Sequence, residues 1–190
     1  MPSKSLVGWQ TVRTSSLDEI EGAHRAIGGQ GRGRRFATLQ LNHAYAVLVA
    51  SRFQGFCRDL HSEAADFLGN AVQPAALRPL AVQLFTTSRQ LDYQNAQPGS
   101  IGADFGRFFM PKFWDEVDSL DPRSPGRRQE LADLNRWRNA IAHQDFAEVG
   151  GASLRLAQVR SWRRTCGSLA RTFDRVLGAR LRVLVGHPPW

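Results

Sequence analysis

The longest helical pattern in the chain is FATLQLNHAYAVLVASRFQGFCRDLHSEAADFL, which runs from Phe36 to Leu68. Apolar side chains recur in it every three to five residues, at Leu41, Tyr45, Leu48, Phe53, Phe56, Leu60, Ala64 and Phe67. On an α-helix this spacing places them on one face. The stretch therefore predicts a long amphipathic helix around which the other elements pack.

Two segments precede this helix. Ser16 followed three residues later by Glu19 matches a capping box and predicts a first helix from Leu17 to about Ile27. The basic, glycine-rich run GGQGRGRR then occupies Gly28 to Arg35. This run is expected to be a solvated linker, and the alternative is a direct contact to phosphate. Residues 1–35 are thus predicted to be an N-terminal helix with its linker.

The segments after the long helix are also helical in pattern. We expect a helix over about 75–93, a loop over 95–109 with its Pro and Gly residues, and an aromatic core segment over 108–120. Turn residues at 121–128 precede a helix of about 129–145, and a last helix spans about 154–185. No segment has a strand pattern. Residues 36–190 are therefore predicted to form an all-α, up-and-down bundle of four to six helices.

Composition limits the function classes. The 190 residues carry a net charge of +8, and Lys4 and Lys112 are the only lysines among 25 basic residues. Arginine suits phosphate recognition, so nucleic acid or an acidic protein is the expected partner. No apolar run is long enough to cross a membrane and no secretory signal precedes the first helix, which favours a cytoplasmic protein. Cys57 and Cys166 lack metal-ligand spacing and are expected to be buried thiols, so no metal or cofactor is predicted.

The stretch RWRNAIAHQDF, from Arg136 to Phe146, places polar residues in a helical run. At 100° per residue, Arg138 falls on the apolar side of the helix, among Leu131, Leu134, Ile141 and Ala142. A guanidinium there needs an acidic partner, an anionic ligand or a cleft made with another subunit. Asn139 and His143 are four residues apart, so the amide can hydrogen-bond the imidazole.

These residue types suit cleavage of RNA without a metal. Histidine can move a proton near neutral pH, and arginine can stabilise the charge that develops on phosphorus. The attacking group would be the 2′-hydroxyl, which leaves a 2′,3′-cyclic phosphate and a 5′-hydroxyl end. The alternative is a histidine at a helix end beside a salt-bridged arginine. Spacing alone does not decide, because Arg182 and His187 repeat it in RVLVGH.

The sequence RNAIAH, Arg138 to His143, resembles the motif of ribonuclease members of the HEPN family, the higher eukaryotes and prokaryotes nucleotide-binding domains. That motif is an Arg, a polar residue, and a His four to six positions after the Arg. The resemblance implies a helical bundle, often a homodimer with a composite RNase site, in which Arg138, Asn139 and His143 are catalytic. Some relatives carry an acidic residue on the long helix where this chain has Gln54.

The resemblance also implies partners. Many members of the family are toxins of toxin–antitoxin pairs or phage-defence effectors, so RNA, a second copy and an antitoxin, acidic or a nucleotidyltransferase, are the expected partners. Arginines near the motif and on the last helix could hold the RNA backbone, or could be a solvated face: Arg136, Arg160, Arg163 and Arg164. The rival function is a HEPN-like module that dimerises or binds RNA, nucleotide or protein without cutting.

Overall fold

The computed structural model describes residues 1–27 and 34–190, and within these residues it forms helices and no strand. Four long helices build the bundle: α2 (Thr14–Ile27), α3 (Arg34–Ala71), α7 (Ser124–His143) and α8 (Leu156–Val185). Four shorter helices accompany them: α1 (Lys4–Gly8), α4 (Arg78–Thr86), α5 (Pro98–Gly106) and α6 (Phe113–Leu120). The predicted all-α helical bundle is confirmed. The predicted linker over 28–35 falls mostly outside the described residues.

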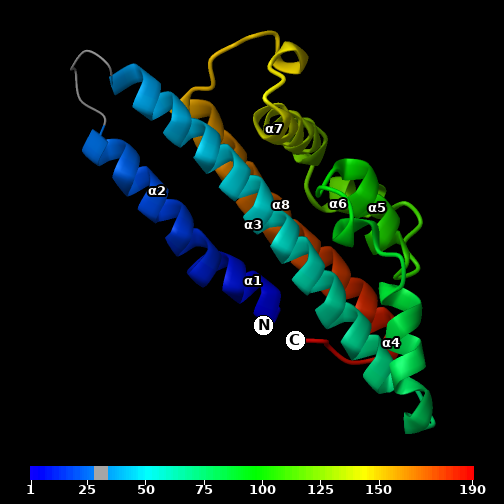
Figure 1. Cartoon of the computed structure of the whole chain (residues 1–190). Coiled ribbons are helices and arrows are strands. Elements are labelled where there is room, and N and C mark those ends of the chain that lie inside the picture. The colour runs from blue at the N-terminus through cyan, green and yellow to red at the C-terminus, as the bar shows by residue number, and fades with distance from the viewer. Residues whose placement is uncertain (28–33) are drawn as a thin grey trace.

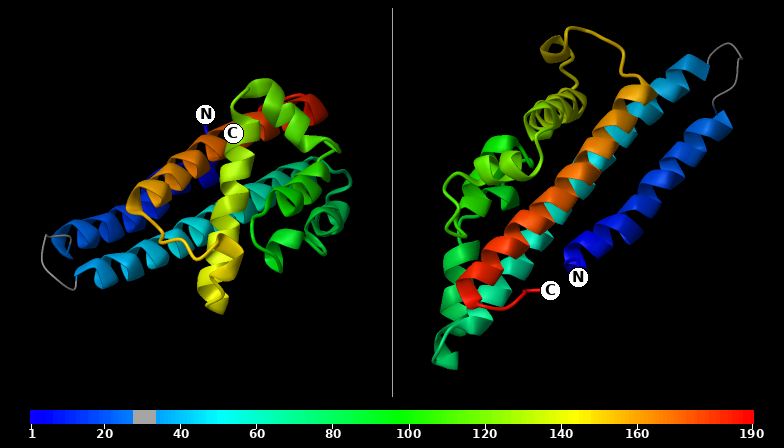
Figure 2. Two further views of the ribbon diagram at one scale, coloured as in Figure 1. Left: turned by 90° about the horizontal axis from the view of Figure 1, so that it is seen from above. Right: turned by 180° about the vertical axis from the view of Figure 1, so that it is seen from behind.

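The centre of the fold is α3, as its apolar face predicted. It contacts α2, α4, α7 and α8, and the side chains of Tyr45, Phe53, Phe56 and Leu60 are fully buried. Figure 1 shows α3 and α8 side by side and running in the same direction, with α2 antiparallel to them on one side and α7 on the other. The view from above in Figure 2 shows that α7 crosses this pair of helices.

The N-terminal segment is a longer helical rod than predicted. It begins at Lys4 and passes through a π-helical turn, Trp9–Arg13, into α2. The predicted capping box at Ser16 is wrong, because the Ser16 hydroxyl lies inside the rod and donates to the carbonyl of Arg13 at 2.9 Å. The residue that caps the rod is Ser3, whose hydroxyl accepts from the amide of Leu6 at 3.0 Å.

The region between α3 and α7 differs most from its prediction. The expected helix over 75–93 ends at Thr86, because Thr87 is extended and Ser88 has a left-handed φ of 55°. A 3₁₀ turn, Gln90–Asp92, follows. The expected loop over 95–109 contains α5, which begins at Pro98, since proline is well tolerated in the first turn of a helix. In the aromatic segment, Phe108 and Phe113 are buried as predicted, whereas Phe109 is exposed.

The cysteines also match their prediction. Cys57 and Cys166 are free and buried, and burial raises the pKa of each thiol above its ordinary value. No described helix combines the length and the apolar character that crossing a membrane requires.

Candidate active site at the end of helix α7

The predicted motif lies in the last two turns of α7. The helix begins at Ser124, earlier than the predicted residue 129, because Pro125 fits its first turn. It ends at His143, since Gln144 takes a left-handed conformation with a φ of 55° and its amide bonds back to the carbonyl of Ile141. The motif thus stands where the helix stops and the chain turns toward α8.

Arg138 occupies the side of α7 that faces the core, as predicted, but at its rim. Leu131 and Leu134 are buried on that side, Arg138 is half-buried, and Ala142, which was expected to be covered, is exposed. Nη1 of Arg138 donates to Oδ1 of Asn139 at 3.2 Å. Among the described residues no carboxylate lies within ion-pair distance of Arg138. Its charge is therefore available to an anion.

Asn139 does not take the role that its spacing predicted. Its Oδ1 accepts a hydrogen bond of 2.7 Å from Nδ2 of Asn95, in addition to the bond from Arg138. The expected hydrogen bond from Asn139 to the His143 ring is not formed. Asn95 arrives from the segment before α5, and no helix periodicity could reveal it. The structure therefore brings Arg138, Asn139 and Asn95 together in one polar contact.

His143 is exposed at the last helical position. Within the described part of the chain its ring makes no hydrogen bond. From Arg138 to His143 the helix turns five residues, which places the two side chains about 140° apart around the axis and about 7.5 Å apart along it. The two side chains therefore leave the helix in different directions.

The other predicted arginines have different surroundings. Arg160 and Arg163 on α8 form ion pairs with Glu21 of α2, at 2.9 and 3.3 Å, and Arg163 also pairs with Asp18 at 2.7 Å. These two guanidiniums hold α2 against α8. Arg136 pairs with Asp133 on the same helix. Arg164 is exposed and has no ion pair among the described residues.

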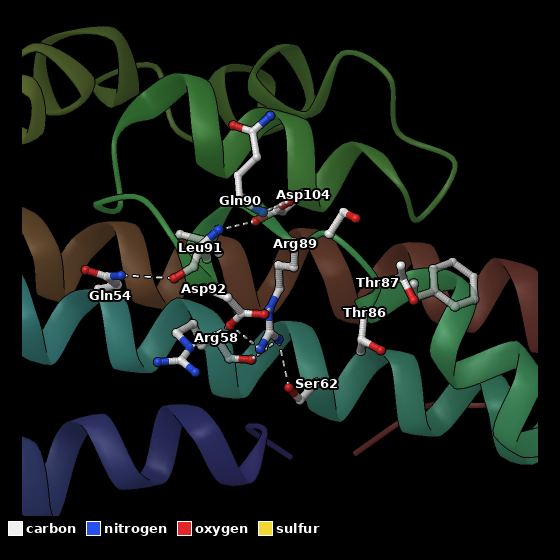
Figure 3. Close-up of polar contacts among 12 residues, drawn as sticks. Gln54, Arg58, Ser62, Thr86, Thr87, Arg89, Gln90, Leu91, Asp92 and Asp104 are labelled. Atoms are coloured by element: carbon white, nitrogen blue, oxygen red, sulfur yellow. Dashed lines mark hydrogen bonds and ion pairs between the residues drawn. The ribbon is translucent and has the colours of Figure 1, made fainter.

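The contact between Asn95 and Asn139 depends on a network that sequence reasoning missed, drawn in Figure 3. Gln54 of α3 donates from Nε2 to the carbonyls of Leu91 and Gln94, at 2.9 and 2.8 Å. The buried Asp104 accepts from the amides of Gln90 and Leu91, at 2.9 and 2.8 Å. Gln54 therefore anchors the segment that carries Asn95.

Arg89 fixes the other end of the same segment to α3. Arg89 is 8% exposed, and its guanidinium pairs with Asp92 at 2.8 Å and donates to the carbonyl of Arg58 and the hydroxyl of Ser62. Figure 3 shows these partners gathered between α3 and the 3₁₀ turn. The hydrogen bonds from Arg89 and its positive charge hold the pKa of the Asp92 carboxyl below its ordinary value. The loop before α5 is thus held from both sides.

A second histidine lies close to the end of α7. The ring of His43 on α3 stacks on Phe146 at 5.3 Å between centroids and lies 6.3 Å from the Trp137 ring. Burial lowers the pKa of His43, so the ring is neutral at neutral pH. Its contacts are those of a packed aromatic side chain that fixes the chain after His143.

In residues 1–27 and 34–190, no group of three or more His, Cys, Asp or Glu side chains is arranged to hold a metal ion. Comparison of the chain with models of known families, with curated proteins and with solved structures gives no match.

Proposed function

We propose that the protein is a metal-independent endoribonuclease of the HEPN type, which cuts RNA to 2′,3′-cyclic phosphate and 5′-hydroxyl ends. The observation that carries the proposal is the half-buried Arg138. It has no carboxylate partner among the described residues, is held by Asn139, and precedes an exposed His143 by five residues. An unpaired, partly desolvated cation favours an anion strongly.

Each residue then has a role in the reaction. The 2′-oxygen attacks phosphorus and the bond to the 5′-oxygen breaks. His143 takes the proton from the 2′-hydroxyl or delivers one to the leaving 5′-oxygen. Arg138 binds the phosphate oxygens on which negative charge accumulates. Asn139, fixed by Asn95, is the positioning residue that holds Arg138 in place.

The angle between Arg138 and His143 supports a site made by two copies. Because the two side chains diverge by about 140° around α7, a second α7 facing the first could place one chain's arginine opposite the other chain's histidine. The working enzyme is therefore proposed to be a homodimer. We further propose that it acts as a toxin or phage-defence effector, kept silent by an antitoxin partner.

The test is incubation of mixed cellular RNA with purified protein in EDTA, followed by analysis of fragment sizes and end chemistry. Wild type should produce fragments with cyclic-phosphate ends, and His143→Ala should lower the rate at least a thousandfold. The matched control is His187→Ala, because Arg182 and His187 have the same spacing in a part of α8 and its tail that carries no asparagine after the arginine. Light scattering should find all three proteins dimeric.

Equal cleavage by wild type and His143→Ala would contradict the enzyme proposal. Intact RNA in every sample, with RNA bound by wild type, would instead favour the module that binds without cutting.

A further inference from the structure

A second basic site lies on the other side of α3 from α7. The first part of the N-terminal rod, residues 4–13, and helix α3 line an open hollow of about 450 Å³. Its lining includes Lys4, Arg13 and Arg52 as cations and Asp59 as the one carboxylate. Figure 1 shows the rod and α7 on opposite sides of α3, so this hollow is separate from the motif on α7.

The state of Arg52 distinguishes the hollow from an ordinary basic surface. Arg52 is half-buried, and its Nε is buried without a hydrogen-bond partner among the described residues. No described carboxylate pairs with it. Burying this N–H group without a hydrogen-bond acceptor is costly, and the positive charge of Arg52 has no carboxylate partner, so an anion bound here would compensate both.

The neighbouring groups do not supply that compensation. Asp59 is paired with Arg13, so its charge is already used. Glu63, one turn further along α3, accepts from the amides of Lys4 and Ser5 and from the Ser5 hydroxyl. The lining of the hollow is therefore left with an excess of two positive charges.

The backbone of α3 makes room for this arrangement at Gly55. A Cβ at this position would lie 2.5 Å from Nη1 of Arg13, so the Arg13 side chain passes close over the backbone of α3 on its way to Asp59. The side chain of Arg13 is 21% exposed and that of Asp59 is 54% exposed. Arg13 and Arg52 thus line the same hollow, and Arg13 is held there by its ion pair with Asp59.

We propose that this hollow is a binding site for a phosphate group, with Arg52 as its main ligand and Arg13 and Lys4 as supporting cations. The planar guanidinium presents paired N–H donors that match two phosphate oxygens, and the lysine adds a point charge. The same chemistry is offered by a free phosphate and by the backbone of RNA. The site does not depend on catalysis by His143.

The test is calorimetric titration at low salt with two ligands, inorganic phosphate and a short oligoribonucleotide without terminal phosphates. The oligonucleotide is added to proteins that also carry His143→Ala, so that it stays intact. Arg52→Gln should weaken binding at least tenfold, and Asp59→Asn should tighten it severalfold because it removes the local negative charge. Arg123→Gln is the matched control, since Arg123 is exposed and its side chain has no described partner.

The two ligands separate the sources of the phosphate. If Arg52→Gln weakens binding of the oligonucleotide, the natural ligand of the site is the RNA backbone. If Arg52→Gln weakens binding of inorganic phosphate alone, the natural ligand is a free phosphate. Equal binding of both ligands by wild type and Arg52→Gln would overturn the proposal, as would the absence of saturable binding. Thermal unfolding should show Arg52→Gln to be at least as stable as wild type, because an unpaired, half-buried charge has been removed.

Discussion

The sequence around His61 indicates little about the environment of its side chain. Its side chain is fully buried, and neither ring nitrogen has a hydrogen-bond partner among the described residues. The ring lies 4.8 Å from that of Phe108 and 5.8 Å from that of Phe105. Burial, aided by the positive charge of Arg89, lowers the pKa of His61 to about 3. The imidazole is therefore packed as an apolar ring and must stay neutral.

Stability should therefore fall as the pH is lowered below about 6.5. The unfolded chain binds a proton at His61 near pH 6.5 and the folded chain only near pH 3, so the loss accumulates between these values. Between pH 7 and pH 5, the His61→Leu variant should lose about 2 kcal/mol less stability than wild type, because each pKa unit is worth about 1.4 kcal/mol. Urea unfolding at both pH values measures the difference. The same replacement at the exposed His187 should leave the pH dependence as in wild type.

The surroundings of Arg138 were predictable only in part from the sequence. Helix periodicity alone placed it on the apolar side of α7, and its half-burial agrees. The contact between Asn95 and Asn139 could not be predicted, because the two residues are 44 positions apart and Asn95 lies in an irregular segment. Sequence reasoning thus identified the motif, and the structure identified the residue that holds it.

At the scale of elements, the long helices were predictable from the sequence, whereas the break after Thr86 and the short helix α5 were not. The long helices α3 and α8 follow from apolar residues at helical spacing, since those residues must share a face to be buried. The break after Thr86 and the appearance of α5 depend on tertiary contacts. The Asp104 carboxylate of α5 accepts hydrogen bonds from the amides of Gln90 and Leu91. These bonds stabilise a turn in a segment whose sequence pattern still predicts a helix.

Asp104→Ala should therefore destabilise this turn. It would leave two amides without acceptors, of which that of Leu91 is buried, at a cost of about 3 kcal/mol in the free energy of unfolding. Urea unfolding measures the loss, and hydrogen exchange at the Leu91 amide should become faster. Asp66→Ala, at an exposed carboxylate of α3, is the control and should change stability little. An unchanged exchange rate at Leu91 would contradict the role assigned to Asp104.

At the scale of the whole molecule, the N-terminal rod is part of the hydrophobic core. Leu6, Trp9 and Leu17 are buried with the residues of α3 and α8. The Trp9 ring packs edge-on against Phe53 at 5.9 Å. Polar contacts close the same interface, because Glu21 accepts from the Tyr45 hydroxyl at 2.5 Å and from Arg160 at 3.0 Å. Burial raises the pKa of Glu21, but these hydrogen bonds and the charges of Arg160 and Arg163 outweigh it and leave the pKa below its ordinary value.

Trp9→Ala should consequently destabilise the whole protein. The lost packing and the cavity left behind should lower the free energy of unfolding by about 4 kcal/mol. Circular dichroism, which follows the helices, and fluorescence of the remaining tryptophans should report one shared transition, because the rod and the bundle share a core. Two separate transitions would show that the rod unfolds independently.

The sequence by itself determined the all-α class, the long helices and the position of the Arg138 to His143 motif, because periodicity and motif spacing are local properties of the chain. Only the tertiary structure decided which charges are free. Nine arginines, among them Arg160 and Arg163, form ion pairs with carboxylates of the described residues, whereas Arg52 and Arg138 do not. The net charge includes every arginine equally. A guanidinium that the fold has left without a carboxylate partner binds a new anion more readily than one that is already paired.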